Sequence, residues 1–234
     1  MGPSSVAMWN RLLRFGFRLL YNELAFTYDL VAWCVSLGKW KAWGRTSMKH
    51  LRGERILEIA HGPGHLLPAL RLAGYRPVGI DLSPTMSRQA AKRVRRDGPN
   101  VPLARCRAQA LPFRAGAFDA AVAAFPTEYI VDPATLREAA RVTKPDGRLV
   151  VVAAASLGGR GPLPKLIHRL YDITGQRDPM PQGTESAFRE TGWHIETVEE
   201  RVGNSTVLLV IGEKALPALT GNGTRINADE HGSG

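Results

Sequence analysis

The chain has 234 residues, of which 44% are hydrophobic, which suits one large domain or a domain with an appended segment. Its 31 Lys and Arg outnumber 21 Asp and Glu, and the net charge of +10 favours an anionic partner such as nucleic acid, anionic lipid or an acidic small molecule. The two cysteines exclude a disulfide framework and lack metal-ligand spacing, and no apolar run approaches the ~20 residues of a transmembrane helix, so we expect a cytoplasmic protein without a metal centre.

The first part of the chain is predicted to be helical. Within residues 8–20, Arg11, Arg14 and Arg18 recur at spacings of three and four and form one stripe. The other side of this helix is apolar and consists of Trp9, Leu12, Leu13, Phe17 and Leu20. Such a helix either packs its apolar side on the domain or lies in a membrane interface. Both interpretations stay open, and the second makes an anionic membrane surface, at the inner face of the membrane, a partner.

Residues 28–43 suggest two further helices, broken near Gly38. Three of the five tryptophans, Trp33, Trp40 and Trp43, lie in this stretch. Aromatic side chains this dense before the first strand could cover a ligand site as a lid. Ordinary helix packing is the alternative for each tryptophan taken singly.

From residue 54 the chain alternates between strand and helix patterns. The predicted strands cover residues 54–60, 77–81, 101–106, 118–125 and 148–155. The predicted helices cover residues 63–73, 83–96 and 133–142, with Gly74 as a C-cap, Ser83 as an N-cap and Pro133 as a first helical residue. A turn is expected from Lys144 to Gly147. The alternation predicts a doubly wound parallel sheet.

The C-terminal part adds a short helix over 164–173, a helix over 184–191 and two strands over 194–201 and 206–213. The turn at Gly203-Asn204 joins the two strands so closely that they must pair antiparallel. We therefore predict an α/β fold with a seven-stranded, mostly parallel sheet and an antiparallel C-terminal hairpin. The predicted organisation is an N-terminal helical segment over 1–50, which is a lid or a membrane-surface element, an α/β domain over 51–215 and a polar, disordered tail over 216–234.

The stretch from Arg55 to Leu66 has the pattern of a strand, a tight turn and a helix. Gly62 and Gly64 allow unusual backbone dihedral angles in the turn and let a ligand approach the backbone closely. Glu58 is an acid inside an otherwise apolar strand. A buried carboxylate needs a partner, and the ammonium group of a ligand at the end of the strand would be one.

Three interpretations of this turn compete. The motif of a dinucleotide site, as in a dehydrogenase, has a third glycine at the position of Leu67, so this stretch matches that motif only in part. S-adenosylmethionine carries both an ammonium and a carboxylate at its methionine end and would satisfy Glu58. A tight turn that binds nothing is the third possibility.

The stretch resembles the first motif of class I S-adenosylmethionine-dependent methyltransferases, Glu/Asp-x-Gly-x-Gly-x-Gly. Glu58, Gly62 and Gly64 match it, and Ala60 replaces its first glycine. Seven strands that end in a hairpin agree with the layout of that fold, and the resemblance covers residues 21–214. It implies a methyltransferase whose cofactor is S-adenosylmethionine.

In such sheets the ligand binds beyond the carboxyl ends of the strands. The resemblance assigns the ribose hydroxyls to Asp81, whose carboxylate can accept both hydrogen bonds of a diol. Arg107 stands where the family usually has an acid beside the adenine, so the Gln109 amide or nearby backbone groups would replace that contact. The cofactor-binding residues that the resemblance implies are Tyr28, Glu58, Ala60, Gly62, Gly64, Asp81, Leu82, Gln109, Ala110 and Phe125.

A narrower resemblance is to the quinone-ring C-methyltransferases of ubiquinone and menaquinone synthesis. Its residues are Tyr28-Asp29, Ser36, Gly38, Trp43, Ala60 and the segment from Ala124 to Pro133. It implies a small apolar, quinone-like or lipid-like methyl acceptor. Departures from the motif at Ala60 and Arg107 keep a non-catalytic module that binds S-adenosylmethionine or a nucleotide as the alternative.

The sequence argues against nucleic acid as a partner, because the basic helix over 83–97 lacks the interleaved aromatic residues that stack on bases. An RNA or protein methyltransferase therefore stays a minority interpretation. The candidates for a general base are Tyr28, Asp132, His61 and His168, and each suits a structural role better. We therefore assign no catalytic residue from the sequence.

Overall fold

The computed structural model describes residues 36–97, 101–158 and 183–214. Several sequence predictions lie outside these ranges. They are the helices over 8–20 and 164–173, the first helix within 28–43 up to residue 35, the tail from residue 216, the cofactor contact of Tyr28, and Tyr28 and His168 as candidate bases. None of the helices within the described ranges is long and apolar enough to span a bilayer.

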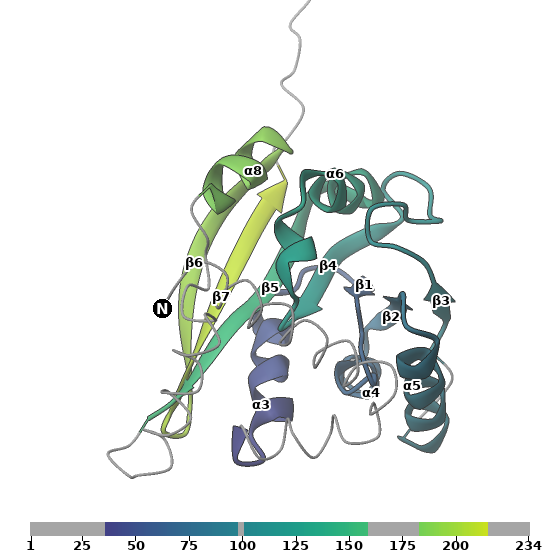
Figure 1. Ribbon diagram of the computed structural model, residues 1–234, viewed down its shortest axis with the longest axis vertical. Coiled ribbons are helices and arrows are strands. Elements are labelled where there is room, and N and C mark those ends of the chain that lie inside the picture. The colour runs from purple at the N-terminus through teal and green to yellow at the C-terminus, as the bar shows by residue number, and fades with distance from the viewer. Residues whose placement is uncertain (1–35, 98–100, 159–182, 215–234) are drawn as a thin grey trace, which may run out of the picture.

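Seven strands form one sheet in the order β3-β2-β1-β4-β5-β7-β6 (Figure 1). The strands are β1 (Arg55–Ile59), β2 (Arg76–Asp81), β3 (Leu103–Arg105), β4 (Phe118–Ala124), β5 (Thr143–Leu157), β6 (Trp193–Val202) and β7 (Ser205–Lys214). The first five strands pair in parallel, and β7 pairs antiparallel with both β5 and β6. This confirms the doubly wound sheet with its C-terminal hairpin, whose turn includes Gly203 at φ +60°.

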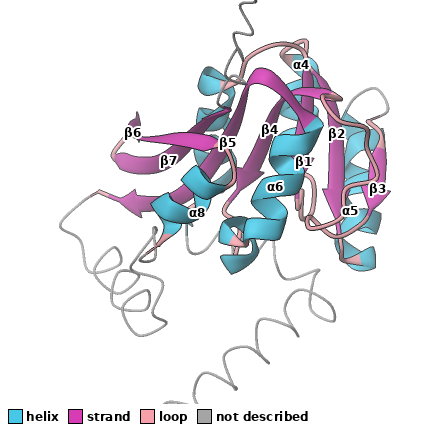
Figure 2. Ribbon diagram, turned by 90° about the horizontal axis from the view of Figure 1, so that it is seen from above, coloured by secondary structure: helices cyan, strands magenta, loops and turns pink. Residues whose placement is uncertain are grey.

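Helices cover both faces of the sheet (Figures 1 and 2). They are α3 (Trp40–Arg45), α4 (Leu66–Leu72), α5 (Pro84–Asp97), α6 (Pro133–Val142) and α8 (Thr184–Glu190), with the short 3-10 helices η1 (Thr46–His50) and η2 (Glu128–Val131). The helices α6 and α8 lie on one face, and α3, α4 and α5 lie on the other (Figure 1).

The alternation of side chains along β4 explains the two layers. Ala121 and Ala123 belong to one apolar cluster with Leu136 of α6, whereas Ala120 and Val122 belong to a second cluster with residues of α3 and α4. All four alanine and valine side chains are fully buried. A strand that is buried on both faces has a nearly continuous run of apolar residues in its sequence, and β4 has this pattern.

The helix starts follow local capping chemistry. The hydroxyl of Ser83 accepts a hydrogen bond from the N–H of Met86 at 3.3 Å, as the predicted N-cap of α5 should. The carboxylate of Asp132 accepts from the N–H of Ala134 at 2.9 Å and caps α6, whose first residue is Pro133 as predicted. The structure thus gives Asp132, a candidate base in the sequence, a structural role.

Most predicted boundaries agree with the structure within two residues, and two differ by three or more. The helix predicted from residue 63 begins at Leu66, because Gly64 has φ +75° and continues the turn. The turn predicted from Lys144 to Gly147 lies inside β5, which begins at Thr143. The pairing of β5 with β4 shifts register there, and Asp146 has φ +62°, so the extra residues form a bulge within the strand.

Candidate active site

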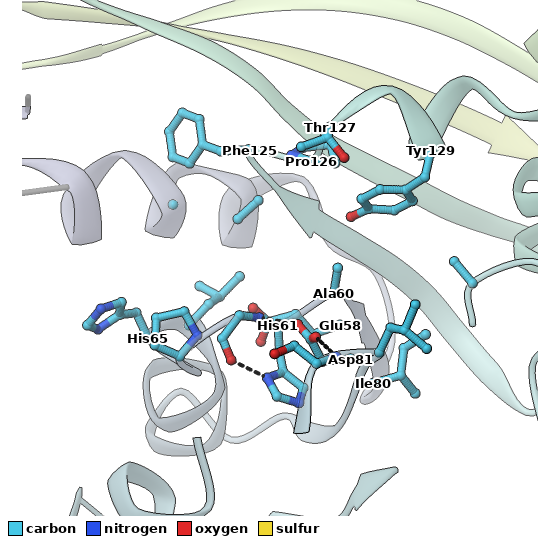
Figure 3. A pocket seen from close by; sticks show the side chains of 18 of the residues that line it. Glu58, Ala60, His61, His65, Ile80, Asp81, Phe125, Pro126, Thr127 and Tyr129 are labelled. Carbon is cyan, nitrogen blue, oxygen red and sulfur yellow. Dashed lines mark hydrogen bonds between the residues drawn. The ribbon is translucent and has the colours of Figure 1, made fainter. Parts of the chain in front are cut away.

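A cavity of about 590 Å³ opens at the carboxyl ends of the parallel strands (Figure 3). Seven of the predicted cofactor residues line it: Glu58, Ala60, Gly62, Asp81, Leu82, Gln109 and Phe125. Gly64 and Ala110 do not line it, and Tyr28 is outside the described residues. The size suits a ligand site, since such sites measure about 300–1,000 Å³.

The cavity has two unlike walls (Figure 3). Glu58 and Asp81, at the ends of β1 and β2, lie on one side, and Phe125, Pro126 and Tyr129 lie on the other. One wall is therefore acidic, and the wall opposite is mainly aromatic and apolar. Such a site can hold a polar cationic group on one side and an apolar molecule on the other.

Glu58 is a buried acid, and one of its carboxylate oxygens has no hydrogen-bond partner within the described part of the chain. Its side chain is 2% exposed, and Oε2 has no hydrogen-bond partner among the described residues. Burial, with a smaller contribution from the charge of Asp81, raises the pKa of Glu58 well above its ordinary value. A cation brought into the cavity would supply the missing partner.

Asp81 joins two backbone turns at the edge of the sheet. Its Oδ2 accepts a hydrogen bond from the N–H of Gly62 at 2.8 Å, and its Oδ1 accepts one from the N–H of Ser83 at 2.7 Å. A carboxylate has about four acceptor sites, so each oxygen keeps capacity for a ligand hydroxyl. The carboxylate thus orders the glycine turn and can still bind a diol.

The two glycines of the turn have different surroundings. A Cβ added to Gly62 would meet no atom within 4 Å, so this backbone is open to a ligand. A Cβ added to Gly64 would lie 2.7 Å from the Cβ of Ala90 in α5. Gly62 therefore permits close approach of a ligand, whereas Gly64 permits close packing of the turn on α5. Ala60 has φ +53°, a left-handed conformation that glycine adopts more readily.

His61 fixes this turn and is not placed to act as a base. Its Nδ1 donates to the carbonyl oxygen of Gly62 at 2.7 Å, and its backbone N–H donates to the carbonyl of Ile80 at 3.0 Å. The ring is buried, and this burial lowers the pKa of His61 despite the opposing effect of Asp81. Nδ1 is engaged by the Gly62 carbonyl, and ring carbon Cδ2 lies so close to Gly79 of β2 that a Cβ added there would be 2.9 Å from it, so the ring packs against the sheet.

Residues 56–147 match the family model described as a methyltransferase domain. The demethylmenaquinone methyltransferase of Thermus thermophilus is 35% identical over 162 residues, which are 65% of this chain and 71% of that protein. The chain belongs to the class I S-adenosylmethionine-dependent methyltransferases. It is also 31% identical to the ubiquinone/menaquinone biosynthesis C-methyltransferase UbiE of Geotalea uraniireducens, over 57% of this chain and 60% of that protein.

Solved structures share the fold of this methyltransferase. The geranyl diphosphate C-methyltransferase of Streptomyces coelicolor, in complex with Mg²⁺, geranyl diphosphate and S-adenosyl-L-homocysteine, has a TM-score of 0.55 at 18% identity. The alignment covers 74% of this chain and 79% of that one. At this identity the likeness concerns the fold alone.

S-adenosylmethionine is the cofactor of the family, and the polar wall fits it. The buried Glu58 lacks a partner for Oε2, as an acid that meets an ammonium group would, and the backbone of Gly62 is open. Within the described ranges, no three His, Cys, Asp or Glu side chains come together as metal ligands would.

The segment predicted beside the adenine is held by side-chain contacts. Gln109 lines the cavity, and its Nε2 donates to Oδ2 of Asp132 at 3.0 Å. This bond and the N–H of Ala134 lower the pKa of Asp132. Ala110 is exposed, and its N–H donates to the carbonyl of Arg107, which closes a turn. Gln109 therefore lines the cavity together with Arg107 and Ala108 of this segment, whereas Ala110 does not.

The aromatic wall depends on contacts between distant parts of the chain. The rings of Trp40 in α3 and Phe125 after β4 have centroids 4.1 Å apart with planes inclined by 31°. Trp43 is 2% exposed and packs in the apolar core, so the packing interpretation holds for that residue. Trp40 was predicted only as part of a candidate lid, and the sequence pattern indicates no role for Lys41 or His65, which also line the cavity.

We expect Gly64→Ala to lower the free energy of unfolding of the methyltransferase by about 2–4 kcal/mol, because the new Cβ would overlap Ala90 and the residue has φ +75°. Gly62→Ala is the matched control. An alanine there adopts the left-handed backbone conformation, which lowers the free energy of unfolding by about 1–2 kcal/mol, but its Cβ meets no other atom. It should instead weaken binding of S-adenosylhomocysteine, because its methyl group enters the cavity. Urea unfolding and calorimetric titration measure the two effects, and equal losses of stability would contradict this assignment.

Proposed function

We propose that this methyltransferase acts on a small apolar acceptor of the quinone or lipid-like class. The observation that carries the proposal is the aromatic and apolar wall of Phe125, Pro126 and Tyr129, which faces the acidic wall across one cavity. Trp40 also lines the cavity, and its ring lies against that of Phe125. Planar rings stack favourably on aromatic side chains. The names of the relatives in Thermus thermophilus and Geotalea uraniireducens, both quinone methyltransferases, support the same class.

The residues on each wall have separate tasks in this proposal. Glu58 holds the ammonium group of the cofactor, and Asp81 accepts hydrogen bonds from the ribose hydroxyls. Phe125 and Trp40 orient the acceptor against the opposite wall and exclude water from it. Bound S-adenosylmethionine supplies an electrophilic methyl group, so positioning of the acceptor is the main contribution of the protein.

In this proposal no residue of the described site has to act as a general base. A general base is needed only if the acceptor keeps its proton during transfer. Asp132 caps α6 and binds Gln109, and both ring nitrogens of His61 are buried or engaged. We therefore propose that an acceptor such as a quinol reaches the site ionised, or loses its proton to water.

Turnover with a short-chain 2-prenyl-1,4-naphthoquinol and S-adenosylmethionine tests the proposal. Mass spectrometry should detect a product that carries one additional methyl group, formed only when enzyme and cofactor are both present. Trp40→Leu should raise KM for the quinol several-fold because a stacking partner is lost, while the affinity for S-adenosylhomocysteine stays unchanged.

Two outcomes would count against this function. Cofactor binding without transfer to quinols, phenols or lipids would favour the non-catalytic module. The departures from the family motif at Ala60 and Arg107 are the reason for keeping that alternative. Transfer to RNA or protein with no transfer to quinols would favour the macromolecular alternative.

A further inference from the structure

The acidic and basic residues that line the cavity differ in how exposed they are. Both acids that line it, Glu58 and Asp81, are buried at 2% and 8% exposure. The three Lys and Arg that line it, Lys41, Arg105 and Arg107, are all exposed. The mouth of the cavity is therefore cationic, whereas its interior is acidic. Binding of the cofactor by the buried acids does not explain the exposed cations at the mouth.

Exposed leucines accompany these cations. Leu82 lines the cavity with 55% of its side chain exposed, and Nε of Arg105 donates to the Leu82 carbonyl at 3.0 Å. A guanidinium group is thus held beside an exposed apolar side chain. Leu37, at 41% exposure, precedes Trp40 of the aromatic wall by three residues. Leu37 and Leu82 are two of only three large hydrophobic residues that are exposed in the described part of the chain.

The helices behind this rim add to the positive field. Together α3, α4 and α5 contain eight Lys and Arg and one acid, whereas α6 and α8 contain three Lys and Arg and three acids. The positive charge is therefore concentrated on one face of the sheet, the face that includes Trp40 and Lys41 (Figure 1). Fields of this kind attract an extended anionic surface over a distance of roughly 8 Å at physiological salt.

We infer that the cavity rim formed by Lys41, Leu82, Arg105 and Arg107 docks on the surface of an anionic lipid bilayer, and that Leu37, exposed three residues before Trp40, adds a second apolar side chain to the contact. Lys and Arg near such a surface are attracted to its headgroups, and leucines beside them enter the boundary of the acyl chains. A soluble anion would engage the cations but gain nothing from the exposed leucines. Docking by the rim turns the cavity toward the bilayer, so an apolar acceptor can enter without crossing water.

The inference goes beyond the proposed function, and vesicle binding tests it without any turnover, so its failure is distinct from failure of the acceptor class. The full chain should co-sediment with vesicles of phosphatidylglycerol and phosphatidylcholine, and not with phosphatidylcholine alone. The double variant Lys41→Glu/Arg107→Glu should reduce the bound fraction at least about tenfold. This variant leaves Arg105, which holds the Leu82 carbonyl, in place.

The matched control is Arg114→Glu/Arg137→Glu, which changes the net charge equally at two exposed arginines that do not line the cavity. It should bind vesicles nearly as the wild type does. Both variants keep residues 1–35, so a contribution of the N-terminal arginines is the same in each. High salt screens the charges, so the vesicle binding that remains there depends on the apolar side chains. Leu37→Asn should weaken this remaining binding, and asparagine tolerates the φ of +50° at this position.

Three results would overturn the inference. Equal binding of the rim variant and the control variant would place the contact elsewhere. Equal loss in both would indicate a general charge effect. Displacement from vesicles by millimolar diphosphate, with no effect of Leu37→Asn, would make the rim a subsite for a soluble anion. A cooperative thermal unfolding transition like that of the wild type serves as the check that the rim variant is folded, because Lys41 and Arg107 line the cavity and cofactor affinity is no neutral readout.

Discussion

Binding of S-adenosylmethionine should release a proton from Glu58. In the protein without cofactor, burial and the charge of Asp81 raise the pKa of Glu58 well above its ordinary value, so the carboxyl keeps its proton where an exposed glutamate would lose it. An ammonium group placed against Oε2 favours the ionised carboxylate and lowers this pKa. The proton then leaves to the buffer, and up to about one proton should be released per cofactor bound.

Calorimetry in buffers of different ionisation enthalpy measures this release directly. The binding enthalpy of S-adenosylmethionine should change in proportion to the ionisation enthalpy of the buffer. Glu58→Gln should remove that dependence and weaken binding about 10- to 100-fold, because a hydrogen bond to a charged group is lost. Glu128→Gln, at an exposed glutamate outside the cavity lining, is the control and should keep the release. No dependence on buffer in the wild type would show that the ammonium does not bind at Glu58.

The same group makes the stability of the cofactor-free protein depend on pH. The folded state binds the Glu58 proton more tightly than the unfolded state does, since folding raises the pKa of Glu58. The contribution to stability is thus fully present below the unfolded pKa of about 4.5, and it is lost as pH rises toward the folded value. Glu58→Gln should therefore unfold at higher temperature than the wild type at neutral pH, and this difference should shrink on acidification.

Asp81→Ala should weaken binding of S-adenosylhomocysteine about 10- to 100-fold. The ribose hydroxyls would lose a charged acceptor, and the N–H groups of Gly62 and Ser83 would lose theirs, so the glycine turn would also loosen. The variant should in addition lower the pKa of Glu58, because it removes the second cause of its rise. Proton release on binding should therefore be smaller.

Asp97→Ala is a control for this variant, since Asp97 is an exposed acid at the end of α5 that does not line the cavity. Calorimetric titration of both variants with S-adenosylhomocysteine gives the comparison. An affinity of Asp81→Ala equal to that of the control would place the ribose at another part of the site.

Local patterns were sufficient to predict most of the fold. Hydrophobic periodicity and the turn at Gly203 determine the strands, the helices and the antiparallel hairpin, because each depends on residues close together in the chain. Glu58 and Asp81 could be placed at the site because the carboxyl ends of neighbouring parallel strands meet at one edge of the sheet. The bulge around Asp146 depends on the register with β4 and has no such local signal.

Contacts between distant segments account for what the sequence did not predict. Gly62 and Gly64 both match the motif, and only the position of Ala90 in α5 distinguishes Gly64, which packs on α5, from Gly62, which lines the cavity. The stacking of Trp40 on Phe125 joins residues 85 positions apart. The capping role of Asp132 had a local signal, an acid directly before Pro133, that favoured a structural interpretation over a base.

The left-handed conformations of Ala60 and Phe125 restrict how this chain can vary over evolutionary time. They follow the neighbouring strands β1 and β4, at φ +53° and +51°, and both line the cavity. Val, Ile and Thr are strongly disfavoured there, since a branched Cβ strains that backbone region most. Drift at these two sites is thus confined to glycine, asparagine, aspartate and a few unbranched residues. New acceptor specificities would have to arise through neighbours such as Thr127 and Tyr129, whose backbone carries no such constraint.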